Sequence, residues 1–236
     1  MEIINEGFGR VEKPDPRDKD FPISKILSED NVPDITEKYW WANGWWGNQG
    51  KTTQCVAYSW VHWIEDGPVI QDSIENRPKP IYEPKNLYDL CQENDRWEGE
   101  AYNGTSVRAG AKILKHVGVI SEYRWAEDIN DVINTLKALG PMVVGTRWYS
   151  EMTHPNPKTS IINPRGKPAG GHAYILNGID TELGLIRIKN SWGRQWGREG
   201  HAFISIDNFA GLLKNGGEAC IAKEIKLDHI PKLLLG

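Results

Sequence analysis

The sequence lacks the features that would direct a chain to a membrane, a secretory route or nucleic acid. No apolar run approaches the roughly 20 residues needed to span a bilayer. The first six residues have neither the basic start nor the apolar stretch of a secretory signal. A net charge of −4 provides no excess of basic side chains for phosphates. We therefore expect no membrane partner and no nucleic-acid partner.

Cysteine is scarce, with three residues at Cys55, Cys91 and Cys220. Three cysteines cannot all pair within one chain, and if Cys55 is reactive only the other two could form a bridge. We therefore expect all three to be reduced and the protein to be cytoplasmic, or delivered by a non-secretory route. No His, Cys or carboxylate spacing fits a zinc site, so we expect no metal and no other cofactor.

The composition is typical of a globular protein, with 39% hydrophobic and 25% charged residues. Helical spacing of apolar residues predicts helices over 55–66, 86–94, 107–117 and 129–139, and a last short one over 207–215. Alternation with period two predicts strands over 142–146, 173–179, 185–189, 202–206 and 219–225. Helices come first and strands second, which favours an α+β class.

The 236 residues are enough for one large domain or for two lobes that share a cleft. We expect a single domain over 1–236. Its first part, 1–38, contains four prolines and little periodicity, and we interpret it as an extended arm that packs on the body. Residues 39–128 are expected to form a mainly helical lobe, and residues 129–236 a mainly β lobe.

Cys55 stands where an irregular loop becomes a helix. Gly and Asn residues break regular structure ahead of it, and an apolar stripe of Val56, Trp60 and Ile64 follows. A thiol on the first turn of a helix faces unpaired backbone N–H groups and the positive end of the helix dipole. Both favour the thiolate, so the sequence predicts a nucleophile with a lowered pKa. The alternative is that Cys55 is a small buried hydrophobe.

A nucleophilic cysteine needs a base, and the sequence contains six histidines. His62 follows Cys55 by seven residues, which places it roughly 10 Å along the helix axis and out of reach. Three others lie among charged, proline-rich or terminal residues: His116, His154 and His229. His172 and His201 remain. Each follows a glycine and opens a strand, so periodicity does not choose between them.

Asn190 follows the strand predicted over 185–189 and shares a face with Ile186 and Ile188. An amide at the end of an apolar face is costly unless it is hydrogen-bonded. One natural partner is the ring N–H of a catalytic histidine, with Trp192 as a cover that keeps water away. The alternative is that Asn190 only opens a turn.

Four residues in one order carry a resemblance to a known family: Gln49, Cys55, His172 and Asn190. The asparagine lies inside the run Lys-Asn-Ser-Trp-Gly at 189–193, and Trp-Gly recurs at 196–197. This pattern resembles the papain family of cysteine peptidases over most of residues 33–225. The resemblance implies a papain-like fold of two lobes, one helical and one an antiparallel sheet or barrel, with the active-site cleft between them.

The resemblance also implies a role for each residue. Cys55 would be the thiolate nucleophile, His172 its imidazolium partner and Asn190 the residue that orients the ring. Gln49 would be the side-chain donor of the oxyanion hole, together with the backbone N–H of Cys55. His201 falls where the family usually has an aromatic residue, so we expect it to be structural.

Four further positions are expected to bind substrate through the same resemblance. Gly104 and Thr105 resemble the stretch whose backbone pairs with an extended substrate. Gly171 precedes the base, and Trp192 shields it. Because Thr105 stands where the family usually has a second glycine, the subsite beside it is expected to be narrower.

Three departures from the family pattern are visible. Thr52 stands where the family has a cysteine that is bonded to the position of Cys91, so this bridge is absent, in line with a reducing compartment. Gly171 stands where Asp or Asn is usual, which changes the local tuning of the base. The arm is far shorter than the family's inhibitory prodomain, as in bacterial, viral or phage-encoded members.

These inferences predict a monomeric cysteine endopeptidase that hydrolyses a peptide or protein substrate through a thioester acyl-enzyme. Two other classes remain open. One is a thiol acyltransferase or isopeptidase on the same fold, in which an amine resolves the acyl-enzyme. The other is a non-catalytic module that holds a peptide in the cleft.

Overall fold

The structure is a computed structural model of the chain, and it describes residues 7–13, 15–40, 45–69, 82–94 and 103–225. The helices are α1 (Cys55–Asp66), α2 (Pro84–Asn94), α3 (Val107–His116), α4 (Ile129–Ala138) and α5 (Ile206–Lys214). The strands are β1 (Glu37–Tyr39), β2 (Ile120–Trp125), β3 (Met142–Tyr149), β4 (Pro168–Asp180), β5 (Leu185–Lys189), β6 (His201–Ser205) and β7 (Glu218–Glu224). Short 3-10 helices are η1 (Pro16–Asp20), η2 (Ile23–Lys25), η3 (Glu29–Asn31) and η4 (Ser150–Thr153).

The strands form one antiparallel sheet in the order β2-β7-β3-β4-β5-β6, and β1 pairs with β4. The register between β4 and β5 places Ile175 opposite Lys189. The next residue, Asn190, therefore comes level with the first half of β4, close to His172. Pairing of these two strands is what brings two residues 18 positions apart into contact.

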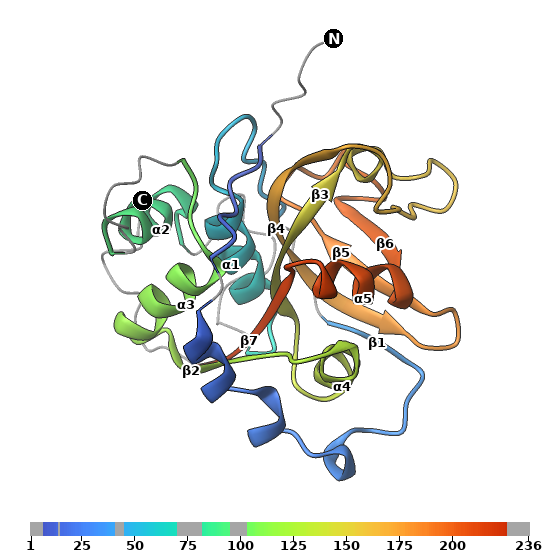
Figure 1. Ribbon diagram of the computed structural model, residues 1–236, viewed down its shortest axis with the longest axis horizontal. Coiled ribbons are helices and arrows are strands. Elements are labelled where there is room, and N and C mark those ends of the chain that lie inside the picture. The colour runs from blue at the N-terminus through green and yellow to red at the C-terminus, as the bar shows by residue number, and fades with distance from the viewer. Residues whose placement is uncertain (1–6, 14, 41–44, 70–81, 95–102, 226–236) are drawn as a thin grey trace.

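Two hydrophobic cores lie on the two faces of the sheet. Alternate residues of one strand belong to different cores: Val143 of β3 packs with α1 to α3, whereas Val144 packs with α4 and α5. In the same way Ala173 lies in the first core and Tyr174 in the second. In Figure 1, α1, α2 and α3 lie to the left of β3 and β4, whereas α4, α5, β5 and β6 lie to their right, and β2 runs below α3.

Helix α1 is the central element of the first core. From Cys55 to Asp66 every residue except Tyr58 is buried, because the helix packs against α2, α3, β3 and β4. Trp60 fits against α3 at Gly110, where an added Cβ would lie 2.2 Å from the Trp60 ring. Gly67 ends the helix with a φ of 94°, a conformation that glycine adopts without steric cost.

A buried polar network joins the far end of α1 to the sheet. Lys189 Nζ donates to Asp66 Oδ1 at 2.6 Å, and both side chains are inaccessible to solvent. Asn177 Nδ2 donates to the other carboxylate oxygen at 2.8 Å, and Arg187 Nε donates to Asn177 Oδ1 at 2.9 Å. Because Lys189 directly precedes Asn190, this network fixes the end of β5 against α1.

The N-terminal segment crosses between the two halves of the molecule. In Figure 1 its dark-blue trace descends in front of α1 and leads to η1, beside the lower end of α3. Asp15 and Asp18 then pair with Arg108 of α3, and the N–H of Trp125 donates to the carbonyl of Phe21 at 2.9 Å. We call residues 7–13 the strap, because they run across the cleft described below.

The sequence prediction of this fold is confirmed in class and in most elements. Helices were expected at α1 to α5, and Ser106 is the N-cap of α3, accepting from the N–H of Ala109 at 3.1 Å. Strands β1 and β2 were not predicted, because β1 has three residues and β2 alternates charged with aromatic side chains that are half-buried. The proline-rich stretch over 68–85 falls largely outside the described residues. The boundaries at 38 and 128 stay predictions.

Removing the buried carboxylate should destabilise the fold strongly. Asp66→Ala leaves the Lys189 ammonium buried without its partner, which costs about 3–5 kcal/mol of unfolding free energy. Asp89→Ala is the control, because it breaks an exposed ion pair with Lys85 and should cost about 0.5 kcal/mol or less. Urea denaturation of the two variants measures both values. A loss below about 1 kcal/mol for Asp66→Ala would show that the network does not hold α1 to the sheet.

Candidate active site

His172 and Asn190 form a buried hydrogen bond. The ring Nε2 lies 2.8 Å from Asn190 Oδ1, and the same oxygen accepts from the backbone N–H of Ser191 at 2.7 Å. An amide oxygen that accepts from a backbone N–H is fixed as an acceptor, so the imidazole Nε2 carries the proton and donates it. In the neutral ring, Nδ1 then holds a lone pair. Nδ1 has no hydrogen-bond partner among the described residues, so it is free to accept a proton.

Aromatic side chains enclose this pair. The Trp192 ring lies 4.9 Å from the His172 ring, tilted by 31°, and Trp148 of β3 meets it edge-on at 4.9 Å. Phe8 of the strap closes the remaining side at 5.8 Å. The imidazole is inaccessible to solvent, and this burial lowers the pKa of His172 to about 4, against the opposing effect of the Asn190 hydrogen bond. The ring is therefore neutral in this arrangement.

Cys55 is the first residue of α1, which packs against β4. Backbone N–H groups of Ala173, Val56 and Arg10 act on its sulfur and favour the thiolate. Ala173 is the residue after His172, so the sulfur lies beside β4 next to the position of the base, but His172 Nδ1 makes no hydrogen bond to it in this arrangement. Burial nevertheless dominates and raises the pKa of Cys55 to about 12.

The predicted lowering of the Cys55 pKa is thus wrong for the structure as it stands. The helix start supplies stabilising N–H groups, as expected, but complete burial outweighs them. The strap contributes to that burial, because it covers the cleft and its residue Arg10 reaches the sulfur through the backbone. With the strap in place, the thiol and the imidazole are both neutral.

Gln49 presents its side-chain amide to a backbone carbonyl. Its Nε2 donates to the carbonyl of Gly7 at 2.6 Å and to that of Thr52 at 2.8 Å, while the hydroxyl of Ser191 donates to its Oε1. The side chain is therefore held on both ends. Its amide N–H groups point at a carbonyl of the strap and at one of the loop before α1, and the expected oxyanion-hole role of Gln49 stays a prediction.

The strap binds the positions that were expected to bind substrate. The N–H groups of Gly9 and Arg10 donate to the carbonyl of Gly171 at 3.1 and 3.0 Å. On the opposite wall, Thr105 donates to the carbonyl of Gly9 at 2.9 Å, and Val11 donates to the carbonyl of Thr105 at 2.9 Å. The strap is thus an extended chain clamped by backbone hydrogen bonds between α3's entry loop and β4.

Two glycines make this close approach possible. An added Cβ at Gly171 would lie 2.1 Å from the carbonyl oxygen of Arg10, and one at Gly104 would lie 2.1 Å from that of Gly9. Side chains at either position would therefore push the strap out. The cleft is not full, since a space of about 300 Å³ remains beside the strap, lined by residues such as Lys51, Thr53 and Asn103.

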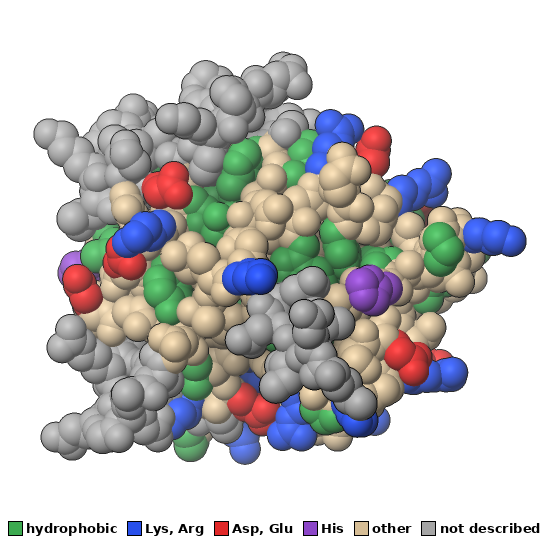
Figure 2. Space-filling view, turned by 90° about the horizontal axis from the view of Figure 1, so that it is seen from above, with side chains coloured by type: hydrophobic (Ala, Val, Ile, Leu, Met, Phe, Trp, Pro, Cys, Tyr) green, Lys and Arg blue, Asp and Glu red, His purple; other side chains and the backbone are tan. Residues whose placement is uncertain are grey.

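Figure 2 shows the molecule from above. Figure 2 shows hydrophobic side chains exposed across the middle of this face, with most charged side chains toward its rim. In the described residues no group of three or more His, Cys, Asp or Glu side chains could hold a metal ion. No helix in the same residues is long and apolar enough to span a membrane.

The other buried histidines have structural partners. The Nε2 of His62 accepts from the N–H of Gly47 at 3.0 Å, under the ring of Trp45. His201 contacts the carbonyl of Glu199 through Nδ1 at 3.0 Å and meets Trp46 edge-on. Neither is hydrogen-bonded to Asn190. All three cysteines are free in the structure.

Sequence reasoning missed the strap's role and several contacts of the site. The strand predicted over 142–146 extends to Tyr149 as β3, and this extension carries Trp148, which is buried against the His172 ring. Phe8 and Arg10 were treated only as part of an extended arm. The signal that could have identified them is the run Gly-Phe-Gly-Arg at 7–10, since alternate glycines permit close backbone approach.

The comparisons with known proteins concern mainly the fold. No family model matches the chain. Gamete and mating-type specific protein A of Dictyostelium discoideum is 27% identical over 110 residues, which are 46% of this chain and 24% of that protein. The chain thus spans about a quarter of the length of that curated relative.

Solved structures match over nearly the whole chain. Xylellain, a cysteine protease from Xylella fastidiosa, aligns with 94% of this chain and 97% of its own, at 18% identity and a TM-score of 0.76. Digestive procathepsin L 3 of Tenebrio molitor larval midgut aligns with 94% of this chain and 77% of its own, at 15% identity and a TM-score of 0.63. The chain has the papain-like fold. The recombinant stem bromelain precursor also aligns, at 15% identity and a TM-score of 0.54, over 97% and 81% of the two chains.

Unseating the strap should make Cys55 reactive. In Gly9→Ala the added methyl would lie 2.1 Å from the carbonyl oxygen of Thr53, so the strap cannot keep its position. Water then reaches the thiol, its pKa falls, and alkylation by iodoacetamide at pH 7.5 should accelerate about tenfold or more. Mass spectrometry of the Cys55 peptide measures the rate.

Gly211→Ala is the matched control, because a methyl there meets nothing within 4 Å, and its Cys55 should react like that of the unmodified chain. Equal alkylation rates in all three proteins would contradict the view that the strap buries the thiol.

Proposed function

We propose that this chain is a papain-like cysteine peptidase that hydrolyses peptide bonds. The observation that carries the proposal is the His172–Asn190 hydrogen bond, which leaves Nδ1 as the ring nitrogen that can accept a proton. A hydrogen-bonded base, a thiol at a helix start and an amide donor in one cleft are the parts that thiol catalysis needs.

In the first half of the reaction, His172 Nδ1 takes the proton of the Cys55 thiol, and the sulfur attacks the substrate carbonyl carbon. The carbonyl oxygen becomes negative, and the Gln49 side chain with the backbone N–H of Cys55 stabilises that charge. The carbon–nitrogen bond then breaks as the imidazolium gives its proton to the leaving amine. The products are a free amine and a thioester on Cys55.

In the second half, water attacks the thioester. His172 takes a proton from the water and returns it to the sulfur as the carbon–sulfur bond breaks, so the enzyme regains its starting state. Asn190 keeps the ring oriented through both transfers and stabilises the imidazolium, while Trp192 and Trp148 keep bulk water from that hydrogen bond.

The substrate is proposed to lie where the strap lies. Gly171 and Thr105 bind the strap through backbone groups, and a peptide in extended form offers the same groups whatever its side chains. The strap must therefore leave before a substrate enters, so we propose that it holds the enzyme inactive. The interpretation of the chain as a monomer in the cytoplasm also stays a proposal.

Substitution of the reacting residues tests the proposed chemistry. In the strap-unseated Gly9→Ala background, Cys55→Ala should abolish cleavage of a peptide library, and His172→Ala should lower kcat/KM about 1,000-fold or more. His201→Gln serves as the control, because its ring contacts Glu199 and Trp46, and it should keep activity within about threefold. Cleavage products identified by mass spectrometry give the rates.

Three outcomes would contradict the proposal in different ways. Activity lost in His201→Gln but kept in His172→Ala would overturn the assignment of the base. Amide products formed with an added amine, in preference to hydrolysis, would identify an acyltransferase. A folded Gly9→Ala variant that binds peptides without cleaving any would identify a peptide-binding module.

A further inference from the structure

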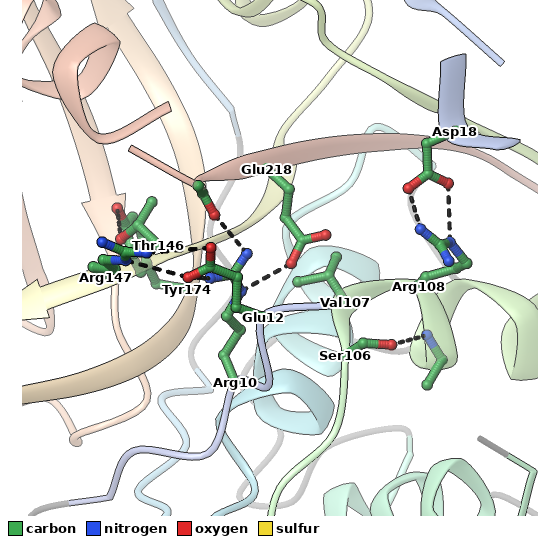
Figure 3. Close-up of polar contacts among 12 residues, drawn as sticks. Arg10, Glu12, Asp18, Ser106, Val107, Arg108, Thr146, Arg147, Tyr174 and Glu218 are labelled. Atoms are coloured by element: carbon green, nitrogen blue, oxygen red, sulfur yellow. Dashed lines mark hydrogen bonds and ion pairs between the residues drawn. The ribbon is translucent and has the colours of Figure 1, made fainter. Parts of the chain in front are cut away.

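Arg10 of the strap directs its side chain away from the cleft backbone and into a pocket with a carboxylate at its base. Its Nε donates to Glu218 Oε1 at 2.9 Å, and its Nη2 donates to the carbonyl of Gly216 at 2.8 Å. The Arg10 side chain is 2% exposed and that of Glu218 is 17% exposed. Figure 3 shows the guanidinium pointing at Glu218 from the strap.

The walls of this pocket belong to the body of the protein and not to the strap. Val107 begins α3, Gly145 lies in the middle of β3, and Glu218 begins β7. An added Cβ at Gly145 would lie 2.7 Å from Arg10 Nε, 2.9 Å from Glu218 Oε1 and 3.0 Å from a Val107 methyl. The space for the guanidinium therefore exists because residue 145 has no side chain. We call it the Glu218 pocket.

The same residue that fills the Glu218 pocket is held by the cleft. The backbone N–H of Arg10 donates to Gly171 at 3.0 Å, one residue before the base, and Arg10 bridges Thr105 on the opposite wall. A chain that replaces the strap between Gly171 and Thr105 therefore also presents a side chain to the Glu218 pocket. The pocket is a subsite of the cleft.

The negative charge of the Glu218 pocket determines which side chain the pocket accepts. Glu218 has Arg10 as its ion-pair partner, whereas nearby Asp15 and Asp18 are already paired with Arg108. When the strap leaves, the Glu218 carboxylate loses its partner in a mostly buried position, which is costly unless a new cation enters. The carboxylate and the Gly216 carbonyl together offer acceptors to two different nitrogens of one planar guanidinium, a match that a lysine ammonium does not reproduce.

We propose that the Glu218 pocket is a specificity subsite that selects arginine in the peptide substrate, and that Arg10 is its built-in occupant. The proposal rests on the proposed peptidase function and names its substrate class, peptides with an arginine near the cleaved bond. Glu218 is the specificity-determining residue.

A cleavage experiment with the full-length Gly9→Ala variant tests this proposal. A peptide library is digested, and the position and identity of residues around each cleaved bond are read by mass spectrometry, without assuming in which direction the substrate lies. Arginine should be enriched at one position. A substrate with that arginine should be cleaved with a kcat/KM about 10- to 100-fold higher than the same peptide with citrulline, its uncharged near-isostere.

Glu218→Gln should remove this preference by lowering the kcat/KM of the arginine peptide to about that of the citrulline peptide. Glu122→Gln is the matched control, because Glu122 pairs with Arg124 at 2.8 Å on β2, outside the cleft, and should keep the preference. An arginine preference that survives Glu218→Gln, or no preference before the substitution, overturns the proposal.

A binding experiment separates failure of this subsite from failure of the peptidase. Calorimetry measures the affinity of the full-length Cys55→Ala, Gly9→Ala variant for the arginine peptide and for its citrulline counterpart, and no turnover is needed. Tighter binding of the arginine peptide, lost in Glu218→Gln, supports the subsite even if no protein form cleaves. Cleavage of peptides combined with equal affinities for the two keeps the peptidase and rejects the subsite.

Discussion

The hydrogen bond between His172 and Asn190 is the contact on which the rest of the site depends. It fixes the proton on Nε2 and so leaves Nδ1 as the ring nitrogen that can accept a proton. Its position follows from the pairing of β4 with β5, and the buried Lys189–Asp66 pair holds that end of β5 against α1. The His172–Asn190 hydrogen bond thus joins β4 to the end of β5, and the Lys189–Asp66 pair joins that end of β5 to α1.

The strap changes the electrostatics of the site as well as its access. It closes the side of the imidazole through Phe8 and contributes to the burial that keeps the Cys55 thiol and the ring neutral. Because the thiol and the imidazole are both neutral, the strap buries no charge when it covers them. The Arg10–Glu218 ion pair anchors the strap in addition to the backbone hydrogen bonds that it makes with Gly171 and Thr105.

Much of the fold was predictable from the sequence because the pattern of buried residues is strong. The stripe in α1 and the alternation in β4 and β5 follow from local periodicity. The apolar face that ends at Asn190 made this residue a candidate, and the family resemblance assigned its role. The two missed strands lie where short length or half-exposed side chains weaken that pattern.

The chemistry of the site was less predictable, because burial is a property of the whole fold. A helix start predicts a stabilised thiolate, but the sequence does not show that a segment 45 residues earlier covers the sulfur. No sequence pattern marks Glu218 as part of a site, because glutamate is common at the start of a strand. Its contact with Arg10 is visible only in the folded structure. The choice of His172 over His201 also came from the family resemblance and not from periodicity.

The most direct test of this account is the protonation of the His172 ring, read from its nitrogen chemical shifts by NMR at pH 7. In the unmodified chain we expect a neutral ring with the proton on Nε2. In Gly9→Ala we expect a shift toward the doubly protonated imidazolium, because the strap no longer excludes water from the ring and the thiol. A proton on Nδ1 in the full-length chain, or identical spectra in both proteins, would contradict it.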